Sequence, residues 1–228
     1  MTFTPSRARW TAALLARMQR HFVVKALGTT LAIGLFFVFY FQLLHHPLFP
    51  VSTMPETALD RLIPFRPEWL IAYLTLWLYV GVGPGLQRDA SDLLNYACWV
   101  GLLCATGLLI FLFWPTQIPP HPIDVAHSPG FALLQGVDAA GNACPSMHVA
   151  IAIFTMLRLQ DVWQRIRAPL FLRAASLLWC AAIVLSTLVT KQHVVLDVIA
   201  GGLLGAAFAA LSLRWVTLQP RWRIARQT

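Results

Sequence analysis

The sequence is poor in charged side chains. Only 11% of its 228 residues are Asp, Glu, Lys or Arg, whereas charged residues make up about a quarter of an ordinary soluble domain. A soluble globule could not cover its surface with so few polar groups, and a disordered chain carries far more charge and far fewer apolar residues. The shortage excludes a disordered chain and argues against both a soluble fold and a nucleic-acid partner, despite a net charge of +8.

Cysteines are also few, and their spacing forms no framework. Cys98, Cys104 and Cys180 fall within apolar runs, and only Cys144 lies between two runs. Nothing in the sequence has the paired spacing of a metal site. We therefore predict no structural disulfide, no bound metal and no cofactor.

What the sequence has instead is 58% hydrophobic residues, arranged in long runs. A helix needs about 20 mainly apolar residues to cross the ~30 Å core of a bilayer, and in lipid its backbone must be bonded internally. We therefore predict an all-α polytopic membrane protein, a bundle of six transmembrane helices. The predicted spans are residues 26–44, 69–86, 93–114, 147–160 with an extension through Trp163, 170–190 and 193–213.

Lysine and arginine predict the orientation. Fourteen of the 17 basic residues fall in the N-terminal segment, in the loops after the second and fourth spans, and in the C-terminal tail. The three exceptions are Arg61, Arg66 and Lys191. By the positive-inside rule both termini are cytoplasmic. The chain then divides into a basic amphipathic segment (1–25), a membrane domain that would hold any catalytic site (26–213) and a basic cytoplasmic tail (214–228).

The N-terminal segment has its own pattern. Trp10, Leu14, Met18 and Phe22 are spaced to share one side of a helix, with arginines between them. This pattern fits a helix lying on an anionic leaflet. A solvated tail fits it equally well.

A histidine and an aspartate stand at the start of the last predicted span. Asp197 is the one formal charge well inside a predicted span, where ionisable groups are costly and usually functional. His193 lies four residues earlier, so both side chains share a helix face. The carboxylate can bind one ring nitrogen and leave the other free as a nucleophile or base. A polar pair that holds helices together fits the spacing equally well.

A second polar group opens the fourth predicted span. Ser146 is placed to cap this helix, and the free N–H groups of a helix N-terminus form an anion site. His148 would lie in the first turn. The orientation predicted from basic residues places His148 and His193 at the same outer depth, although 45 residues separate them in the sequence.

These residues resemble motifs of the type 2 phosphatidic acid phosphatase superfamily. PSMH at 145–148 is similar to its Pro-Ser-x-His motif, and His193-x3-Asp197, preceded by Ser186, is similar to its last motif, Ser-Arg-x5-His-x3-Asp. The methionine of PSMH and the run TKQHVVLDVIAG resemble the inositolphosphorylceramide synthase-like branch more closely. The run PTQIPPHP occupies the place of the first family motif but lacks its Lys and Arg, and Thr187 replaces the Arg of the last motif.

The resemblance implies an integral membrane lipid-phosphate phosphatase that acts at the outer leaflet without a metal. By similarity, His193 would attack the phosphorus and form a phosphohistidine, and Asp197 would orient it. His148 would protonate the leaving oxygen and then activate water. We expect a bacterial inner-membrane protein whose site faces the periplasm or the cell exterior, with a lipid phosphate and membrane lipids as partners.

The same resemblance implies phosphate-binding residues. Ser146 and the N–H groups that begin the fourth span would hold phosphoryl oxygens. Lys191, two residues before His193, would replace the missing arginine, and His121 would contribute from the loop. Arg66 is a further candidate for the positive charge that phosphoryl transfer requires.

Other functions remain open at this point. A lipid or sugar hydroxyl in place of water would make the protein a head-group phosphotransferase. Two histidines on separate helices could instead ligate haem, and a non-catalytic scaffold or transporter could use GGLLG at 201–205 as a small-xxx-small packing motif. The sequence leaves the lipid and the oligomeric state undetermined.

Overall fold

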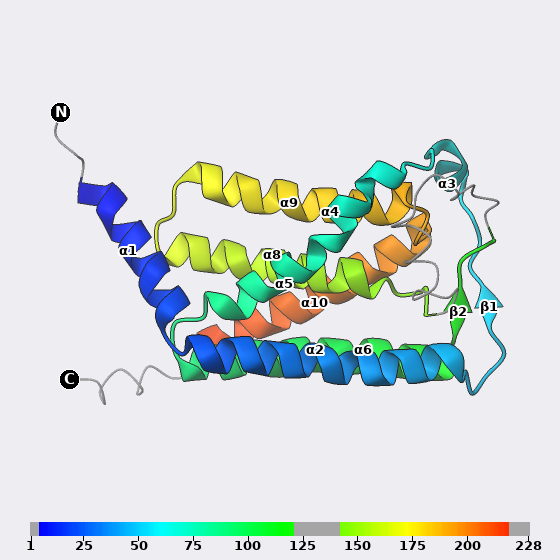
Figure 1. Ribbon diagram of the computed structural model, residues 1–228, viewed down its shortest axis with the longest axis horizontal. Coiled ribbons are helices and arrows are strands. Elements are labelled where there is room, and N and C mark those ends of the chain that lie inside the picture. The colour runs from blue at the N-terminus through cyan, green and yellow to red at the C-terminus, as the bar shows by residue number, and fades with distance from the viewer. Residues whose placement is uncertain (1–4, 121–141, 219–228) are drawn as a thin grey trace.

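The computed structural model describes residues 5–120 and 142–218, and this part of the chain is mostly helical (Figure 1). The elements are α1 (Pro5–Gln19), α2 (Phe22–His45), β1 (Ser52–Thr53), α3 (Ala58–Leu62), η1 (Pro67–Trp69), α4 (Leu70–Leu74), α5 (Leu76–Gly85), α6 (Ala90–Phe113), β2 (Thr116–Gln117), α8 (Met147–Arg165), α9 (Leu170–Val189) and α10 (Val195–Leu218). The prediction of a helical fold is confirmed, and helix occurs in each of the six predicted ranges.

Four helices of the described chain are long and apolar enough to cross a membrane. They are α2, α6, α9 and the Val195–Trp215 part of α10. The protein is therefore an integral membrane protein. The second predicted span differs from expectation because it is interrupted at Thr75, between α4 and α5. The fourth predicted span, α8, is more polar than these four apolar helices because it carries Arg158 and Asp161.

The α8 helix lies at the centre of the bundle, packed against α10, α9, α5 and α6. Its closest neighbour is α10, where Gly201 and Gly205 face the backbone of α8 at Ser146 and Ala150. A Cβ atom at either glycine would overlap a carbonyl oxygen of α8. The GGLLG run thus brings the two helices that carry the candidate histidine motifs into backbone contact.

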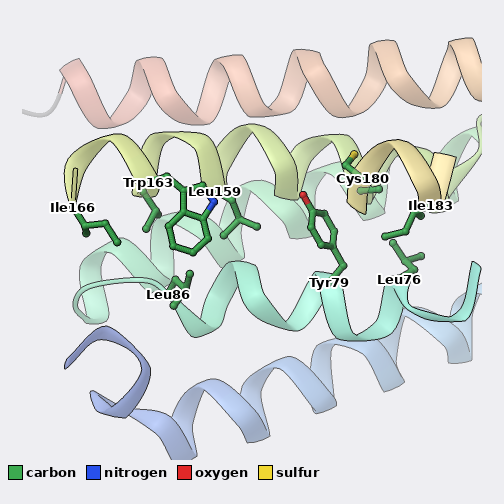
Figure 2. Close-up of a cluster of buried hydrophobic side chains, with 10 residues drawn as sticks. Leu76, Tyr79, Leu86, Leu159, Trp163, Ile166, Cys180 and Ile183 are labelled. Atoms are coloured by element: carbon green, nitrogen blue, oxygen red, sulfur yellow. The ribbon is translucent and has the colours of Figure 1, made fainter. Parts of the chain in front are cut away.

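A buried cluster joins α5, α8 and α9 (Figure 2). Leu76 and Tyr79 of α5 face Leu159 of α8 and Ile183 of α9. The Tyr79 hydroxyl donates a hydrogen bond to the Ser176 carbonyl at 3.2 Å. This packing fixes α5 against the central helix, while α4 packs against α9.

One charged residue lies deeper than the sequence predicts. Arg158 was counted among the basic residues of the loop after the fourth span and its margin, but it belongs to α8 and is only 4% exposed. Its guanidinium carbon lies 5.9 Å from the centre of the Tyr96 ring, within the range of a cation–π interaction. Asp197 is therefore not the one formal charge buried within the bundle.

The N-terminal helix also departs from expectation. The α1 helix ends at Gln19, and His21 has a left-handed backbone conformation (φ 56°) before α2 begins at Phe22. Phe22 therefore does not share a face of α1 with Trp10. The Trp10 ring packs edge-on against Phe171, with centroids 6.4 Å apart, so α1 contacts the bundle.

A buried lysine joins α1, α2 and α5 at the end of the bundle where α1 lies (Figure 1). Lys25 is 4% exposed, and its ammonium group donates to the carbonyls of Arg17 (2.6 Å), Gly85 (3.0 Å) and Gln87 (2.8 Å). All three donors of the group are used. The α1 helix, the loop after α5 and the loop after α8 lie at this end of the bundle (Figure 1).

At the opposite end, the chain segments between helices are tied together. β1 pairs in parallel with β2, with Ser52 opposite Thr116, and Ser52 N–H donates to the Pro115 carbonyl. Thr116 in turn accepts a bond from Cys144 N–H at 2.8 Å. This end, which also carries α3 (Figure 1), holds the start of both α8 and α10.

Candidate active site

His148 stands in the first turn of α8, and the local sequence fixes the start of this helix. Ser146 is the N-cap, as predicted, because its hydroxyl oxygen accepts a bond from Val149 N–H at 3.3 Å. Ser146 N–H donates to the Asp197 carbonyl at 3.0 Å. The cap of α8 is thereby bonded to the first turn of α10.

His193 lies in the turn between α9 and α10. The Thr187 carbonyl, at the end of α9, accepts bonds from both Gln192 N–H (3.0 Å) and His193 N–H (3.1 Å). Lys191 takes a left-handed conformation (φ 54°) within this turn. At the other side, Asp197 accepts a bond from Val194 N–H at 3.1 Å. The turn therefore holds the His193 backbone between two helix ends.

The structure brings the two histidines together. Their ring centroids are 6.0 Å apart, with the planes tilted by 57°. His193 Nδ1 lies 3.5 Å from Asp197 Oδ2, and the Asp197 side chain is fully buried. Because Nδ1 faces the Asp197 carboxylate, Nε2 is the ring nitrogen of a neutral His193 that can react. The three residues form one group, as their predicted common depth required.

Two aromatic residues that sequence reasoning missed surround His148. The Tyr73 ring stacks on His148 with centroids 4.4 Å apart, and the Tyr73 hydroxyl lies 3.4 Å from His148 Nδ1. Trp77 contacts the same ring edge-on at 6.1 Å. Both residues belong to an apolar run, where nothing distinguishes them from lipid-facing or core side chains. They restrict how the His148 ring can turn.

A buried carboxylate, also missed, supports the turn of His193. Asp60 in α3 is 4% exposed, and its Oδ1 accepts a bond from Val195 N–H at 2.8 Å. Its Oδ2 accepts bonds from both the N–H and the hydroxyl of Thr57, each at 2.7 Å. Asp60 thus joins the first loop to the N-terminus of α10.

The charge of Asp60 is stabilised in place. Burial raises the pKa of its carboxyl, but hydrogen bonds from Thr57 and Val195 and the nearby Lys191 ammonium group outweigh burial. The pKa therefore lies below its ordinary value. The Asp60 side chain is a carboxylate throughout the physiological range and places a fixed negative charge at the start of α10, where the helix dipole favours it.

The predicted phosphate-binding residues are brought together only in part. Ser146 adjoins the histidines, at the cap of α8. The Lys191 ammonium group donates to the Asp60 carbonyl at 2.8 Å, which uses one of its three donors. Arg66 is exposed and lies 3.8 Å from Glu68, while its N–H donates to the Val189 carbonyl near the same turn. His121 lies outside the described residues.

The histidine pair opens on an apolar cavity of about 1020 Å³ that both rings help to line. In the described chain, no group of three or more His, Cys, Asp or Glu side chains could hold a metal ion, and all four cysteines are free. The site contains the His193 imidazole next to the Asp197 carboxylate, the His148 imidazole with its centroid 6.0 Å from that of His193, and the N-terminus of α8. Together these groups suit nucleophilic transfer of an anionic group.

Comparison with known proteins gives one match. A family model described as the PAP2 superfamily matches residues 90–221, more than half of the chain. The matched region runs from α6 through α10 and contains His148, His193 and Asp197. Neither a curated protein nor a solved structure matches the chain.

Proposed function

The chain belongs to the PAP2 superfamily, whose members are generally phosphatases of phosphate esters, and on this premise we propose that it hydrolyses lipid phosphates. One observation carries the proposal. His148 and His193 come from motifs 45 residues apart, yet their rings meet at 6.0 Å beside Asp197 and at the mouth of an apolar cavity. A phosphate ester with a hydrocarbon chain matches both parts of this site.

In the first step, His193 Nε2 attacks phosphorus. An N–P bond forms, the bond between phosphorus and the ester oxygen breaks, and His148 gives its proton to the departing oxygen. Asp197 beside Nδ1 holds the ring of His193 in position and stabilises the positive charge that the ring gains. Free lipid alcohol leaves along the cavity.

In the second step, His148 has become the base. It takes a proton from a water molecule, whose oxygen attacks the phosphorus of phosphohistidine. The N–P bond breaks, inorganic phosphate is released, and the His193 imidazole is free again. The Tyr73 hydroxyl, 3.4 Å from His148 Nδ1, leaves Nε2 of His148 to handle the proton in both steps.

Phosphate binding falls to groups around the two rings. We assign the phosphoryl oxygens to the N–H groups of Met147 and His148 and to the Ser146 hydroxyl proton, because Val149 N–H is bonded to the Ser146 hydroxyl oxygen. We propose that Lys191, whose ammonium group donates to the Asp60 carbonyl, turns toward the phosphate and adds its charge. His121 stays a candidate from the loop, in the place of the first family motif.

The orientation completes the proposal. We place six spans across the bilayer, with α4 and α5 together as the second and α8 as the fourth, both termini in the cytoplasm, and the histidines at the outer leaflet of a bacterial inner membrane. Basic residues support this orientation, because Arg88, Arg165 and Arg167 lie in or beside loops at the end opposite the histidines. The methionine of the PSMH motif and the run TKQHVVLDVIAG are the sequence features that support a position near the inositolphosphorylceramide synthase-like branch.

The test is turnover of a panel of lipid phosphates by the purified protein, with free phosphate and lipid products both measured. Phosphate release without a new phospholipid identifies a phosphatase, and transfer to an added lipid hydroxyl identifies a phosphotransferase. His193→Ala is expected to abolish turnover. His148→Ala is expected to let a phosphoenzyme accumulate, because the base that activates water for its hydrolysis is lost.

His45→Ala is the matched control. His45 is an exposed histidine at the end of α2, bonded to its own helix at the Phe41 carbonyl, and it does not line the cavity. Its substitution should leave the rate unchanged. Full activity in His193→Ala would show that the nucleophile is wrongly assigned, and a Soret band in the purified protein would indicate haem instead.

A further inference from the structure

The segment that leads into α8 carries a polar side chain that the proposed mechanism does not use. Asn142 has a left-handed backbone conformation (φ 58°) and is only 3% exposed. Asparagine is one of the few residues besides glycine that adopt this conformation readily. The next two N–H groups, of Ala143 and Cys144, donate to the carbonyl and hydroxyl oxygens of Thr116 at 3.0 and 2.8 Å. The Asn142 backbone is therefore held against β2.

The same segment is packed against the histidine site. Ala143 and Cys144 belong to a buried cluster with Val194, the residue that follows His193. Asn142 itself lines the cavity on which both histidines open. Its side chain therefore borders the space in which a phosphoryl group would react.

The hydrogen bond of the Asn142 amide fixes which way its oxygen points. Nδ2 donates to the Tyr40 carbonyl of α2 at 3.0 Å. A carbonyl can only accept, so the nitrogen of the amide must lie on the side of α2. Oδ1, on the other side, has no hydrogen-bond partner among the described residues and is not sealed from the cavity. Asn142 thus presents an acceptor to the cavity.

Such an acceptor is rare in this space. Among the described residues that line the cavity there is no Asp, Glu or Gln and no second Asn, and most lining side chains are aliphatic or aromatic. A water molecule that attacks the phosphohistidine carries two hydrogens, and His148 takes only one of them. A second hydrogen without an acceptor in an apolar space costs free energy. Oδ1 of Asn142 supplies that acceptor.

We propose that Asn142 orients the hydrolytic water and makes the site prefer water to an alcohol. This inference rests on the proposed function. The water oxygen attacks phosphorus and the N–P bond breaks. One proton passes to His148, while the other stays on the oxygen, enters the phosphate product and donates to Oδ1 during the attack. A lipid or sugar hydroxyl has a single hydrogen, which His148 takes, so Oδ1 would lose its partner and the alcohol is disfavoured.

The experiment measures how the phosphoenzyme divides between water and an added alcohol. Purified protein in lipid nanodiscs turns over a lipid phosphate in the presence of 1-propanol, and inorganic phosphate and propyl phosphate are both measured. Asn142→Gly keeps the backbone conformation but removes the acceptor, so the ratio of propyl phosphate to inorganic phosphate should rise about three- to tenfold, the effect of one hydrogen bond. In a rapid-quench experiment the same variant should release lipid alcohol in a burst and phosphate slowly, because only the second step uses water.

Two further variants separate this role from a structural one. Asn142→Asp keeps an oxygen acceptor but loses the N–H that binds the Tyr40 carbonyl, so its Tm should fall while its product ratio stays near that of the wild type. Asn95→Ala is the matched control. Asn95 of α6 accepts a bond from the Ser212 hydroxyl at 3.4 Å and does not line the cavity, so its loss should leave the ratio unchanged.

The outcomes also separate this inference from the proposed function. An equal fall of both products in Asn142→Gly, with the ratio unchanged, would overturn the role of Asn142 and leave the phosphatase intact. The same rise of the ratio in Asn142→Asp would overturn it too, because the effect would then come from the lost bond to α2. A wild type that transfers phosphate to alcohols without releasing inorganic phosphate would contradict the preference for water. If the wild type turned over no lipid phosphate, the proposed function would fail and this inference with it.

Discussion

Replacing Asp60 by alanine should damage the site without touching any reacting group. The substitution removes the acceptor of Val195 N–H and both bonds to Thr57. It leaves His193, His148 and Asp197 chemically unchanged. The start of α10 then loses its side-chain bond to α3, and the turn that carries His193 keeps its link to α3 through the bond from Lys191 to the backbone carbonyl of residue 60. The Lys191 ammonium group also loses the carboxylate next to it.

The expected loss of stability follows from these bonds. A hydrogen bond to a charged acceptor contributes about 1.5–3 kcal/mol, and loss of a capping residue costs about 1 kcal/mol. Together, Asp60→Ala should reduce the free energy of unfolding by about 2–4 kcal/mol. For a chain of this size, each kcal/mol lowers Tm by about 2–4 °C, so a fall of roughly 5–15 °C is expected. Asp60→Asn keeps one oxygen acceptor and should fall between Asp60→Ala and the wild type.

Thermal unfolding in detergent and lipid-phosphate turnover should be measured on the same preparations. Asp89→Ala is the control, because Asp89 caps α6 through Asp92 N–H at 2.9 Å and lies at the other end of the bundle. It should lose about 1 kcal/mol of stability with kcat/KM unchanged, whereas Asp60→Ala should lose at least about tenfold in kcat/KM while still folded. Equal activity in the two variants would refute the positioning role of Asp60.

The pH dependence of Asp60 has a definite sign. Because its pKa is lowered in the folded protein, its contribution to stability is fully present above the unfolded pKa of about 3.9 and is lost as pH falls through the lower folded value. The Tm difference between wild type and Asp60→Asn should be constant from neutral pH to about pH 5 and shrink below about pH 4. A difference that grows on acidification would contradict this assignment.

Further predictions concern helix packing, the second histidine, phosphate binding and metal. Gly205→Val should force α10 away from the α8 backbone and lower both Tm and kcat/KM, at a cost of about 1–3 kcal/mol. Gly202→Val should be mild, because its Cβ would meet only ordinary contact at 3.9 Å. Tyr73→Phe should keep the ring stacked on His148 yet lower kcat about tenfold with little change in KM, and an unchanged kcat would remove the hydroxyl from the mechanism. Lys191→Ala should lower kcat/KM, and an unaltered rate would assign the phosphate charge to the loop instead. A chelator should leave turnover unchanged, so strong inhibition would indicate a metal.

The helices could be predicted because apolar run length is a local property of the sequence. The structure differs from the predicted helices where contacts between residues far apart in the sequence determine the conformation or the burial of a residue. The interruption at Thr75 coincides with a hydrogen bond that its hydroxyl oxygen accepts from Trp179, 104 residues away. Arg158 was placed near a loop because it is charged, but Tyr96 of another helix covers it. Neither contact leaves a sign in the nearby sequence.

In the candidate site, too, some features could be predicted from local sequence and others depend on contacts between distant residues. The common depth of His148 and His193 could be predicted from their motifs and from the distribution of basic residues. Thr57-x-x-Asp60 has the spacing of a capping box, so the start of α3 was within reach of sequence reasoning. The bond that Asp60 accepts from Val195 N–H, 135 residues along the chain, could not be predicted in this way. Tyr73 offered no signal, because a tyrosine in an apolar run usually needs no partner beyond the core.

The buried Lys25 has a consequence for how the chain is made. Of its three acceptors, the Arg17 carbonyl exists as soon as α2 emerges from the ribosome, while those of Gly85 and Gln87 are synthesised 60 residues later. Until then the Arg17 carbonyl is the only one of these three acceptors that has been made. The Lys25 bonds that join α2 to the end of α5 can therefore form only after α5 has been synthesised.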